Sequence, residues 1–238
     1  MSVNVTIDVI IAASGSGLRL GGDIPKQFQY IDDMPVIAHT TQAFNRLDIT
    51  REIIIAVPPD YVSHTNEIVT NHRLTKVNKI IPGGINRASS VYLALSQLSP
   101  DSQVVLIHDG VRPFVSEDII TAVANSAKIN NAAVAGIPLI DTIKKVDTGG
   151  QVIKTPDRSQ FWRVQTPQGF TYELILKAYT QGQKDNILAQ VTDDSALVER
   201  LGIPVQMVKG NPLNIKITTP EDLILCEMLL KQVKQNRT

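Results

Sequence analysis

The chain has little cysteine, few aromatic residues and no net charge. Its 238 residues include one cysteine and 5% aromatic residues, and 23 basic side chains balance 23 acidic ones, for a formal net charge of +0. A single cysteine, Cys226, excludes an internal disulfide, and its apolar surroundings predict a small buried residue rather than a reactive thiol. Balanced charge gives no overall attraction to nucleic acid or to an acidic membrane, so anions must be bound by local clusters.

The sequence also lacks long apolar runs. No stretch approaches the roughly 20 apolar residues of a membrane span, and no basic region precedes the first apolar run, as it would in a secretion signal. We therefore expect a cytoplasmic protein with no membrane or nucleic-acid partner. With 43% hydrophobic and 19% charged residues, the composition is that of a globular protein, and the length predicts one domain over 1–238.

Short β-branched runs alternate along the chain with longer amphipathic segments. The runs predict strands at 8–13, 53–58, 79–81, 104–108 and 133–137, and the amphipathic segments predict helices at 34–46, 61–72, 88–98 and 116–128. Near-continuous apolar strands that alternate with helices are typical of a mostly parallel sheet covered on both faces. We therefore expect a doubly wound α/β fold.

The segment 139–171 interrupts this alternation. A Thr-Gly-Gly turn between short polar runs predicts a hairpin at 147–151. We interpret the whole segment as a protruding antiparallel β-arm. After it, helices near 171–182 and 194–201, a strand at 204–208 and a C-terminal helix are expected, the last with Thr219 as N-cap and Pro220 at its first position.

A glycine-rich loop follows the first predicted strand, in the sequence AASGSGLRLGGDIPKQF. Backbone N–H groups in such a loop bind phosphate oxygens, and Arg19 and Lys26 would add cationic donors. The loop lacks the Gly-Lys-Ser/Thr of the ATP-binding P-loop, and Leu20 stands where the dinucleotide fingerprint needs a third glycine. Taken alone, the loop is also compatible with a flexible turn carrying solvated charges.

Further polar residues fall near the ends of other predicted strands, where open α/β sheets bind ligands. GGINRASSV places Arg87 and Ser90 on one helical face, HDGVRPF places Asp109 beside Arg112, and NIKITTPEDL contains Lys216. A lone Asp109 would more often be solvated or capping, and a lone Lys216 would be an exposed lysine. Together they predict a phosphate site, with Asp109 as a carboxylate ligand of Mg²⁺.

The blocks AASGSGLRL, PKQF, GGINRASSV, HDGVRPF, DTIKKV, TPDRSQFWRVQTPQGF, TDDSALVE and NIKITTPEDL together resemble the 2-C-methyl-D-erythritol 4-phosphate cytidylyltransferase family from about residue 7 to 230. The resemblance implies a Rossmann-like nucleotidyltransferase of isoprenoid precursor synthesis that joins CMP from CTP to methylerythritol phosphate and releases pyrophosphate. The related ribitol 5-phosphate cytidylyltransferases are the alternative within the enzyme class, although TDDSALVE favours the erythritol branch. A non-catalytic nucleotide-binding homologue is the alternative outside it, and it would not need all four of Arg19, Lys26, Asp109 and Lys216.

The resemblance also implies a role for particular residues. The catalytic cations would be Arg19, Lys26 and Lys216. The CTP-binding residues would be Ala12, Ala13, Gly15, Ser16, Gly17, Gly84, Arg87, Ser90 and Asp109, with Ala12, Ala13, Gly84 and Ser90 around cytosine and Asp109 on Mg²⁺. The polyol phosphate would be bound by Arg112, Thr142, Arg158, Thr166 and Thr192, with Thr142 and Arg158 reaching across from the arm of a second subunit in a homodimer. A phosphomonoester, with a second pKa of about 6, needs no general base, so we expect His108 to be a hydrogen-bonded structural residue.

Overall fold

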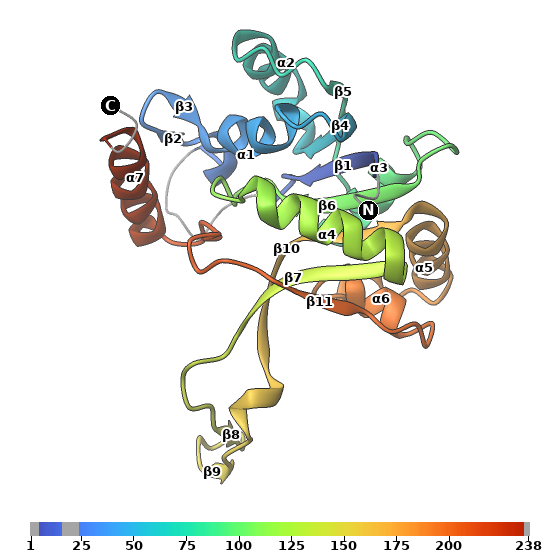
Figure 1. Cartoon of the computed structure of the whole chain (residues 1–238), viewed down its shortest axis with the longest axis vertical. Helices are drawn as coiled ribbons and strands as arrows, with labels where there is room; N and C mark the ends of the chain where they lie inside the picture. Colours follow the sequence, from blue (N-terminus) through green and yellow to red (C-terminus); the bar gives the residue numbers. More distant parts are fainter. Residues whose placement is uncertain (1–4, 16–23, 236–238) are drawn as a thin grey trace.

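A seven-stranded sheet forms the centre of the computed structural model, which describes residues 5–15 and 24–235 (Figure 1). The strand order is β11-β7-β10-β6-β1-β4-β5. The strands are β1 Ile7–Ala12, β4 Thr50–Val57, β5 Val77–Pro82, β6 Val104–Asp109, β7 Ala132–Pro138, β10 Trp162–Thr171 and β11 Gln206–Lys209. A short hairpin of β2 Tyr30–Ile31 and β3 Met34–Pro35 lies outside this sheet.

Neighbouring strands run parallel except around β10, which is antiparallel to both β6 and β7. The register pairs Ala12 with Asp109 at the carboxyl ends of β1 and β6. Two strands that the sequence predicts to end in functional residues therefore end side by side. The mostly parallel α/β fold is confirmed.

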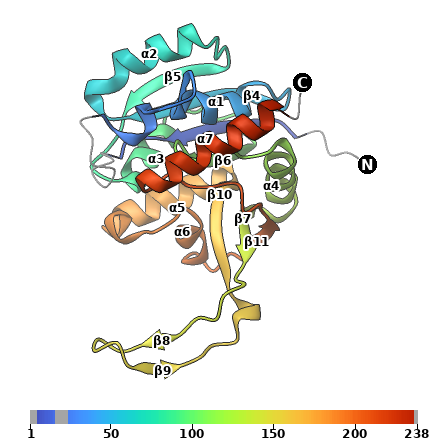
Figure 2. The ribbon, with the colours of Figure 1, turned by 90° about the vertical axis from the view of Figure 1, so that its left-hand side faces the viewer.

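Helices cover both faces of the sheet (Figure 2). The helices are α1 Val36–Asn45, α2 Val62–Asn71, α3 Arg87–Leu95, α4 Glu117–Asn130, α5 Tyr172–Lys184, α6 Ser195–Glu199 and α7 Pro220–Gln235. Helices α1, α2 and α4 share one hydrophobic cluster with the sheet, and α3, α5 and α6 share the other. Successive residues of β1 alternate between the two clusters, with Val9 and Ile11 in the first and Ile10 in the second. This two-sided burial explains why the strand is apolar almost throughout.

Side chains cap the helices that border the carboxyl end of the sheet. Asn86 caps α3 in a capping box with Ser89, and Ser116 caps α4. Pro220 is the first residue of α7, as expected, and the Asp222 carboxylate accepts the Thr219 N–H at 2.9 Å. These contacts fix where α3 and α7 begin, and so they fix the loops in front of them.

Helix α7 packs over a third, smaller cluster that includes Ile217 and Cys226. Cys226 is fully buried, and burial raises the pKa of its thiol to about 12, so the thiol is a packing residue, as predicted. Among the described residues, no helix is both long and apolar enough to cross a bilayer.

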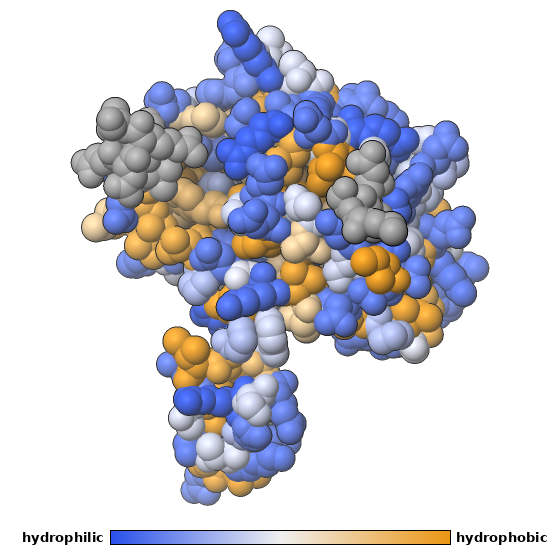
Figure 3. Space-filling view, viewed as in Figure 1, coloured by the Kyte–Doolittle hydropathy of each residue, from blue (hydrophilic) through white to orange (hydrophobic). Residues whose placement is uncertain are grey.

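The arm projects away from the body of the molecule (Figures 1 and 2). Its tip is the hairpin of β8 Lys145–Val146 and β9 Val152–Lys154, closed by a hydrogen bond from the Asp147 N–H to the Gln151 carbonyl. The arm is shorter than the 139–171 expected, because β10 is buried in the central sheet from Gln165 onward. Apolar side chains collect on the arm surface (Figure 3); the exposed ones are Ile140, Val146, Val152, Ile153, Phe161, Trp162 and Val164.

Candidate active site

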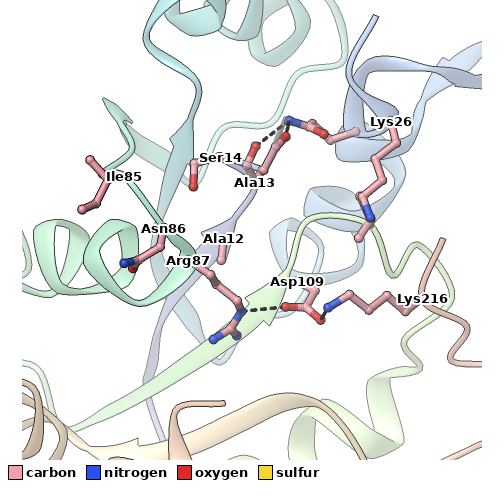
Figure 4. A pocket seen from close by; sticks show the side chains of 13 residues that line it. Ala12, Ala13, Ser14, Lys26, Ile85, Asn86, Arg87, Asp109 and Lys216 are labelled. Carbon is pink, nitrogen blue, oxygen red and sulfur yellow. Dashed lines mark hydrogen bonds and ion pairs between the residues drawn. The ribbon is translucent and has the colours of Figure 1, made fainter. Parts of the chain in front are cut away.

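A cavity of about 370 Å³ lies at the carboxyl ends of β1 and β6. Its walls come from the segments that follow β1, β5 and β6 (Figure 4). The lining residues are Ala12, Ala13, Ser14, Gly15, Lys26, Gln27, Gly84, Ile85, Asn86, Arg87, Asp109, Val111 and Lys216. The fold thus gathers in one place the polar clusters that the sequence distributes over the ends of several strands.

Gln27 fixes the start of the glycine-rich loop. Its buried side-chain amide donates to the carbonyls of Ala13, at 2.7 Å, and Gly15, at 2.9 Å. Both amide hydrogens therefore hold the chain on either side of Ser14. The sequence gives no sign of this role of Gln27 beyond its place beside Lys26 in PKQF. In Figure 4 the Lys26 side chain points down towards the ion pair of Asp109 and Lys216.

Ser90 supports the opposite wall from behind. It is fully buried and does not line the cavity. Its hydroxyl donates to the Asn86 carbonyl at 2.8 Å, accepts the Gly84 N–H at 3.0 Å and lies 2.6 Å from the Ser14 hydroxyl. These contacts saturate Ser90, so the Ser14 hydroxyl donates to it and keeps lone pairs for the cavity. The serine that lines the cavity is therefore Ser14, with Ser90 directly behind it. The resemblance instead places Ser90 against the base.

A second cavity of about 260 Å³ adjoins the first. Its lining residues are Arg87, Asp109, Arg112, Val164, Gln165, Thr166, Gln168, Thr192, Asp193 and Lys216. The two cavities share Arg87, Asp109 and Lys216. Of the residues that the resemblance assigns to the polyol phosphate, Arg112, Thr166 and Thr192 line the second cavity.

Three cations surround the shared carboxylate. Asp109 Oδ1 accepts from Arg87 Nε at 3.0 Å, while Oδ2 lies 2.9 Å from Lys216 Nζ and 3.3 Å from Arg112 Nε. Burial alone would raise the pKa of Asp109, but Arg87, Lys216 and Arg112 together hold it well below its usual range. Asp109 is therefore ionised at any physiological pH. It keeps Arg87 and Lys216 where they border both cavities, and Arg112 where it borders the second.

His108 has the structural role that the sequence predicts. The ring is fully buried, and burial lowers its pKa from 6.5 to about 3, so the imidazole is neutral. Its Nε2–H donates to the Arg112 carbonyl at 3.2 Å, which leaves Nδ1 to accept the Thr166 hydroxyl at 3.0 Å. That hydroxyl accepts the Asp109 N–H at 3.1 Å. His108 thus orients Thr166 beneath the shared carboxylate and has no contact with solvent.

The segment before α7 is tied down on several sides, and this positions Lys216. Gln165 donates from Nε2 to the Asn211 carbonyl at 2.8 Å, and Asn214 donates from Nδ2 to the Thr166 carbonyl at 2.8 Å. Arg112 donates from Nη1 to the Asn214 carbonyl at 2.8 Å. Sequence reasoning missed Gln165 and Asn214, because their partners lie far away along the chain.

The remaining predicted residues lie outside these cavities. Thr142 and Arg158 are exposed on the arm and line neither cavity. Arg158 instead donates from Nη1 to the carbonyl of Ile140 at 2.5 Å, within the arm. The predicted phosphate-binding residues Ser16, Gly17 and Arg19 fall outside the described ranges 5–15 and 24–235.

Within those ranges, no cluster of three or more acidic, histidine or cysteine side chains forms a protein-only metal site. Asp109 is the one acidic side chain that lines both cavities in the described chain. This donor set fits Mg²⁺, which binds through one or two carboxylates and completes its coordination with substrate phosphates and water.

A sequence model of the 2-C-methyl-D-erythritol 4-phosphate cytidylyltransferase family matches residues 7–232. The chain is 43% identical over 230 residues to the protein of that name from Alkaliphilus oremlandii, covering 96% of this chain and 97% of the relative. It is 41% identical over 227 residues to the one from Desulforamulus reducens, covering 95% and 96%.

Solved structures give the same result. The 4-diphosphocytidyl-2C-methyl-D-erythritol synthase of Anaerococcus prevotii superposes with a TM-score of 0.84 at 32% identity, covering 96% of this chain and 97% of that one. The 2-C-methyl-D-erythritol 4-phosphate cytidylyltransferase of Thermus thermophilus superposes with a TM-score of 0.78 at 30% identity, covering 95% and 100%.

Proposed function

The chain belongs to the 2-C-methyl-D-erythritol 4-phosphate cytidylyltransferase family, and from this premise we propose that its two adjoining cavities hold the two substrates. The enzyme transfers CMP from CTP to methylerythritol phosphate in isoprenoid precursor synthesis. CTP occupies the first cavity and the polyol phosphate the second. The observation that supports this placement is the wall of Arg87, Asp109 and Lys216 that both cavities share, because the reacting phosphates must meet at a common boundary.

Cytosine lies at the end of the first cavity formed by Ala12, Ala13, Ser14 and Gly84. The Ala12 carbonyl already accepts the Gly110 N–H, and the Ala13 carbonyl already accepts from Gln27, so each keeps one lone pair. The exocyclic amine of cytosine needs such acceptors, and the Ser14 oxygen is another. The base contact that the resemblance gives to Ser90 thus passes to Ser14, with Ser90 behind it.

The chemical step follows from the charges. A phosphate oxygen of the polyol phosphate forms a bond to the α-phosphorus of CTP, and the bond from that phosphorus to the pyrophosphate oxygen breaks. Pyrophosphate leaves with the electron pair. Lys26, Lys216 and Arg19 stabilise the negative charge on the equatorial oxygens of the transition state. The polyol phosphate is already a nucleophile near neutral pH, and the buried, neutral His108 suits a reaction without a general base.

Mg²⁺ would bind through Asp109 together with phosphate oxygens of CTP. When bound, it would neutralise triphosphate charge and polarise the α-phosphate. For Asp109 to accept the ion, Lys216 must move from Oδ2 onto a phosphate oxygen, which its partly exposed side chain allows.

The arm supports a homodimer in which each subunit completes the other's site. The arm extends away from its own body, carries exposed apolar side chains, and places Thr142 and Arg158 outside both cavities of its own chain. A projecting two-stranded hairpin is marginal in water unless its apolar side is covered. We also assign the enzyme to the cytoplasm, in keeping with its single unpaired cysteine.

Subunit complementation tests the placement and the dimer together. Lys26→Ala removes a cation from the nucleotide cavity and should lower turnover roughly 100-fold, as loss of one oxyanion donor does. Arg158→Ala should mainly weaken polyol-phosphate binding. If the arm serves the partner, a mixed dimer of the two variants contains one wild-type site, built from the Lys26 of one chain and the Arg158 of the other.

The assay is pyrophosphate release with CTP, Mg²⁺ and methylerythritol phosphate at a subsaturating concentration of the polyol phosphate. Equal amounts of the two variants, unfolded and refolded together, should recover about a quarter of wild-type activity, since random pairing makes half the dimers mixed. Each variant refolded alone is the control. Activity no greater than the mean of these controls would mean that each arm serves the site of its own chain. Wild-type turnover by Lys26→Ala would remove Lys26 from the reaction.

A further inference from the structure

The shared wall continues beyond both cavities into the protein interior. Arg87 pairs with Asp109 through Nε only, and its other two nitrogens bond to the carboxylate of Asp194. Asp194 is fully buried and lines neither cavity. A buried charge behind an active-site arginine needs a physical reason, because burial of a carboxylate is unfavourable unless it is paired.

The geometry of this pair is specific. Nη1 of Arg87 lies 2.9 Å from Oδ1 of Asp194, and Nη2 lies 2.8 Å from Oδ2, which is the bidentate arrangement that fixes the plane of a guanidinium. The Tyr179 hydroxyl donates to the same Oδ1 at 2.5 Å. Tyr179 is fully buried on α5, so its hydroxyl orients Asp194 and has no contact with either cavity.

Asp194 also competes with Asp109 for Arg87. An arginine facing only one carboxylate tends to bind both of its oxygens. Because two nitrogens of Arg87 are held by Asp194, only Nε reaches Asp109, and it contacts only Oδ1. Oδ2 is left to Lys216 and Arg112, which come from the substrate side. The guanidinium is therefore held at a fixed angle at the boundary of the two cavities.

A second observation connects Asp194 to the substrates. Asp194 follows Thr192 and Asp193 along the chain, and both of these line the second cavity. The Asp193 carboxylate accepts from Gln168 Nε2 and from the Ser195 hydroxyl, each at 3.0 Å. The turn that borders the second cavity is thus fixed by Asp194 to the arginine that borders both cavities.

We propose that Asp194 and Tyr179 are positioning residues for catalysis: through the Arg87 guanidinium they set the angle at which the two substrate phosphates meet. This inference rests on the proposed placement of the substrates. Neither residue touches a substrate. Disturbing them should therefore affect the chemical step more than the binding of either substrate, because Arg87 remains present but is no longer held in place.

Tyr179→Phe is the decisive variant, because it removes a single oxygen and keeps the packed ring. We expect kcat to fall roughly tenfold, the scale of one lost hydrogen bond to a charged group, while KM for CTP and for methylerythritol phosphate changes less than about twofold. Tyr92→Phe is the matched control. The Tyr92 ring stacks on Tyr179 with centroids 6.0 Å apart, so this change alters the same cluster without touching Asp194. It should leave kcat unchanged.

Asp194→Asn should lower kcat further than Tyr179→Phe, because an amide binds Arg87 less strongly than a carboxylate. If this variant fails to fold, Tyr179→Phe and its control decide alone. A Tyr179→Phe enzyme with wild-type kcat, or one whose loss is matched by Tyr92→Phe, would overturn the proposal. Failure of the proposed substrate placement is seen separately, since Lys26→Ala would then keep wild-type turnover with methylerythritol phosphate.

Discussion

His108 should make the stability of the fold depend on pH between about pH 7 and about pH 5, above the range in which most carboxylates titrate. In the folded protein burial lowers the pKa of His108 from 6.5 to about 3. Below the unfolded value the unfolded chain binds a proton that the folded protein excludes, so stability falls as the pH is lowered from 6.5 towards 3. One pH unit corresponds to about 1.4 kcal/mol. Acidification from about pH 7 to about pH 5 should therefore lower the free energy of unfolding by about 2 kcal/mol through this residue.

His108→Gln tests this magnitude. Glutamine cannot be protonated, and its amide can replace part of the hydrogen bonding to Arg112 and Thr166. Urea unfolding at about pH 7 and about pH 5 gives the free energy of unfolding at each pH. Over that interval it should fall by about 2 kcal/mol more in the wild type than in the variant. The pKa of His39 is also lowered, chiefly by burial, but its contribution is common to both proteins and cancels.

His64→Gln is the matched control, because His64 is exposed on α2. It should keep the wild-type pH dependence. Equal losses of stability in wild type and His108→Gln would refute the argument, since a buried, neutral His108 cannot leave the pH profile unchanged. Activity has no part in this measurement, so the result stands apart from any catalytic interpretation.

Two further predictions concern the first cavity. Gln27→Ala should raise KM for CTP about tenfold or more, because two hydrogen bonds that hold the loop on either side of Ser14 are lost; steady-state pyrophosphate release measures this, and an unchanged KM would show that the loop needs no support from Gln27. Removal of divalent cations with EDTA should abolish turnover and added Mg²⁺ should restore it, with Asp109→Asn needing roughly ten times more Mg²⁺ for half its maximal rate; an equal requirement in the variant would exclude Asp109 as the ligand.

The sequence predicts those parts of the fold in which a strand is apolar and its end is polar. β1 and β6 are almost uniformly apolar because both faces are covered, and this pattern is readable from residue types alone. Asp109, Arg87 and Lys216 follow such strands or precede a helix with a clear start, so their convergence at one edge of the sheet could be inferred.

β10 could not be predicted, because its buried half does not look apolar. Gln165, Thr166 and Gln168 are buried there, and each finds a partner far along the chain; Gln168, for example, accepts the Ser195 N–H at 3.0 Å. Polar residues are compatible with a central strand only when such partners exist. Residue types do not reveal partners at long range, which is why the segment resembled an arm.

The same limit explains why Asp194 escaped notice: its partner Arg87 is 107 residues away along the chain. A carboxylate in TDDSALVE gives no sign in the sequence that it is fully buried. Only the fold, by packing α5 against both α3 and α6, brings Asp194 and the Tyr179 hydroxyl to this arginine.

Asp109 also holds together the cations that surround it. Arg87, Arg112 and Lys216 would repel one another at such short range without an anion between them, and Asp109 supplies that anion before any substrate is bound. In the proposed placement, phosphate groups that enter from either cavity would meet cations already gathered at the boundary. Once Lys216 has moved from Asp109 onto a phosphate oxygen, little reorganisation would remain for the transition state, which is the condition under which fixed charges accelerate a phosphoryl transfer most. One carboxylate at the end of β6 thus holds the three cations together before any substrate is bound.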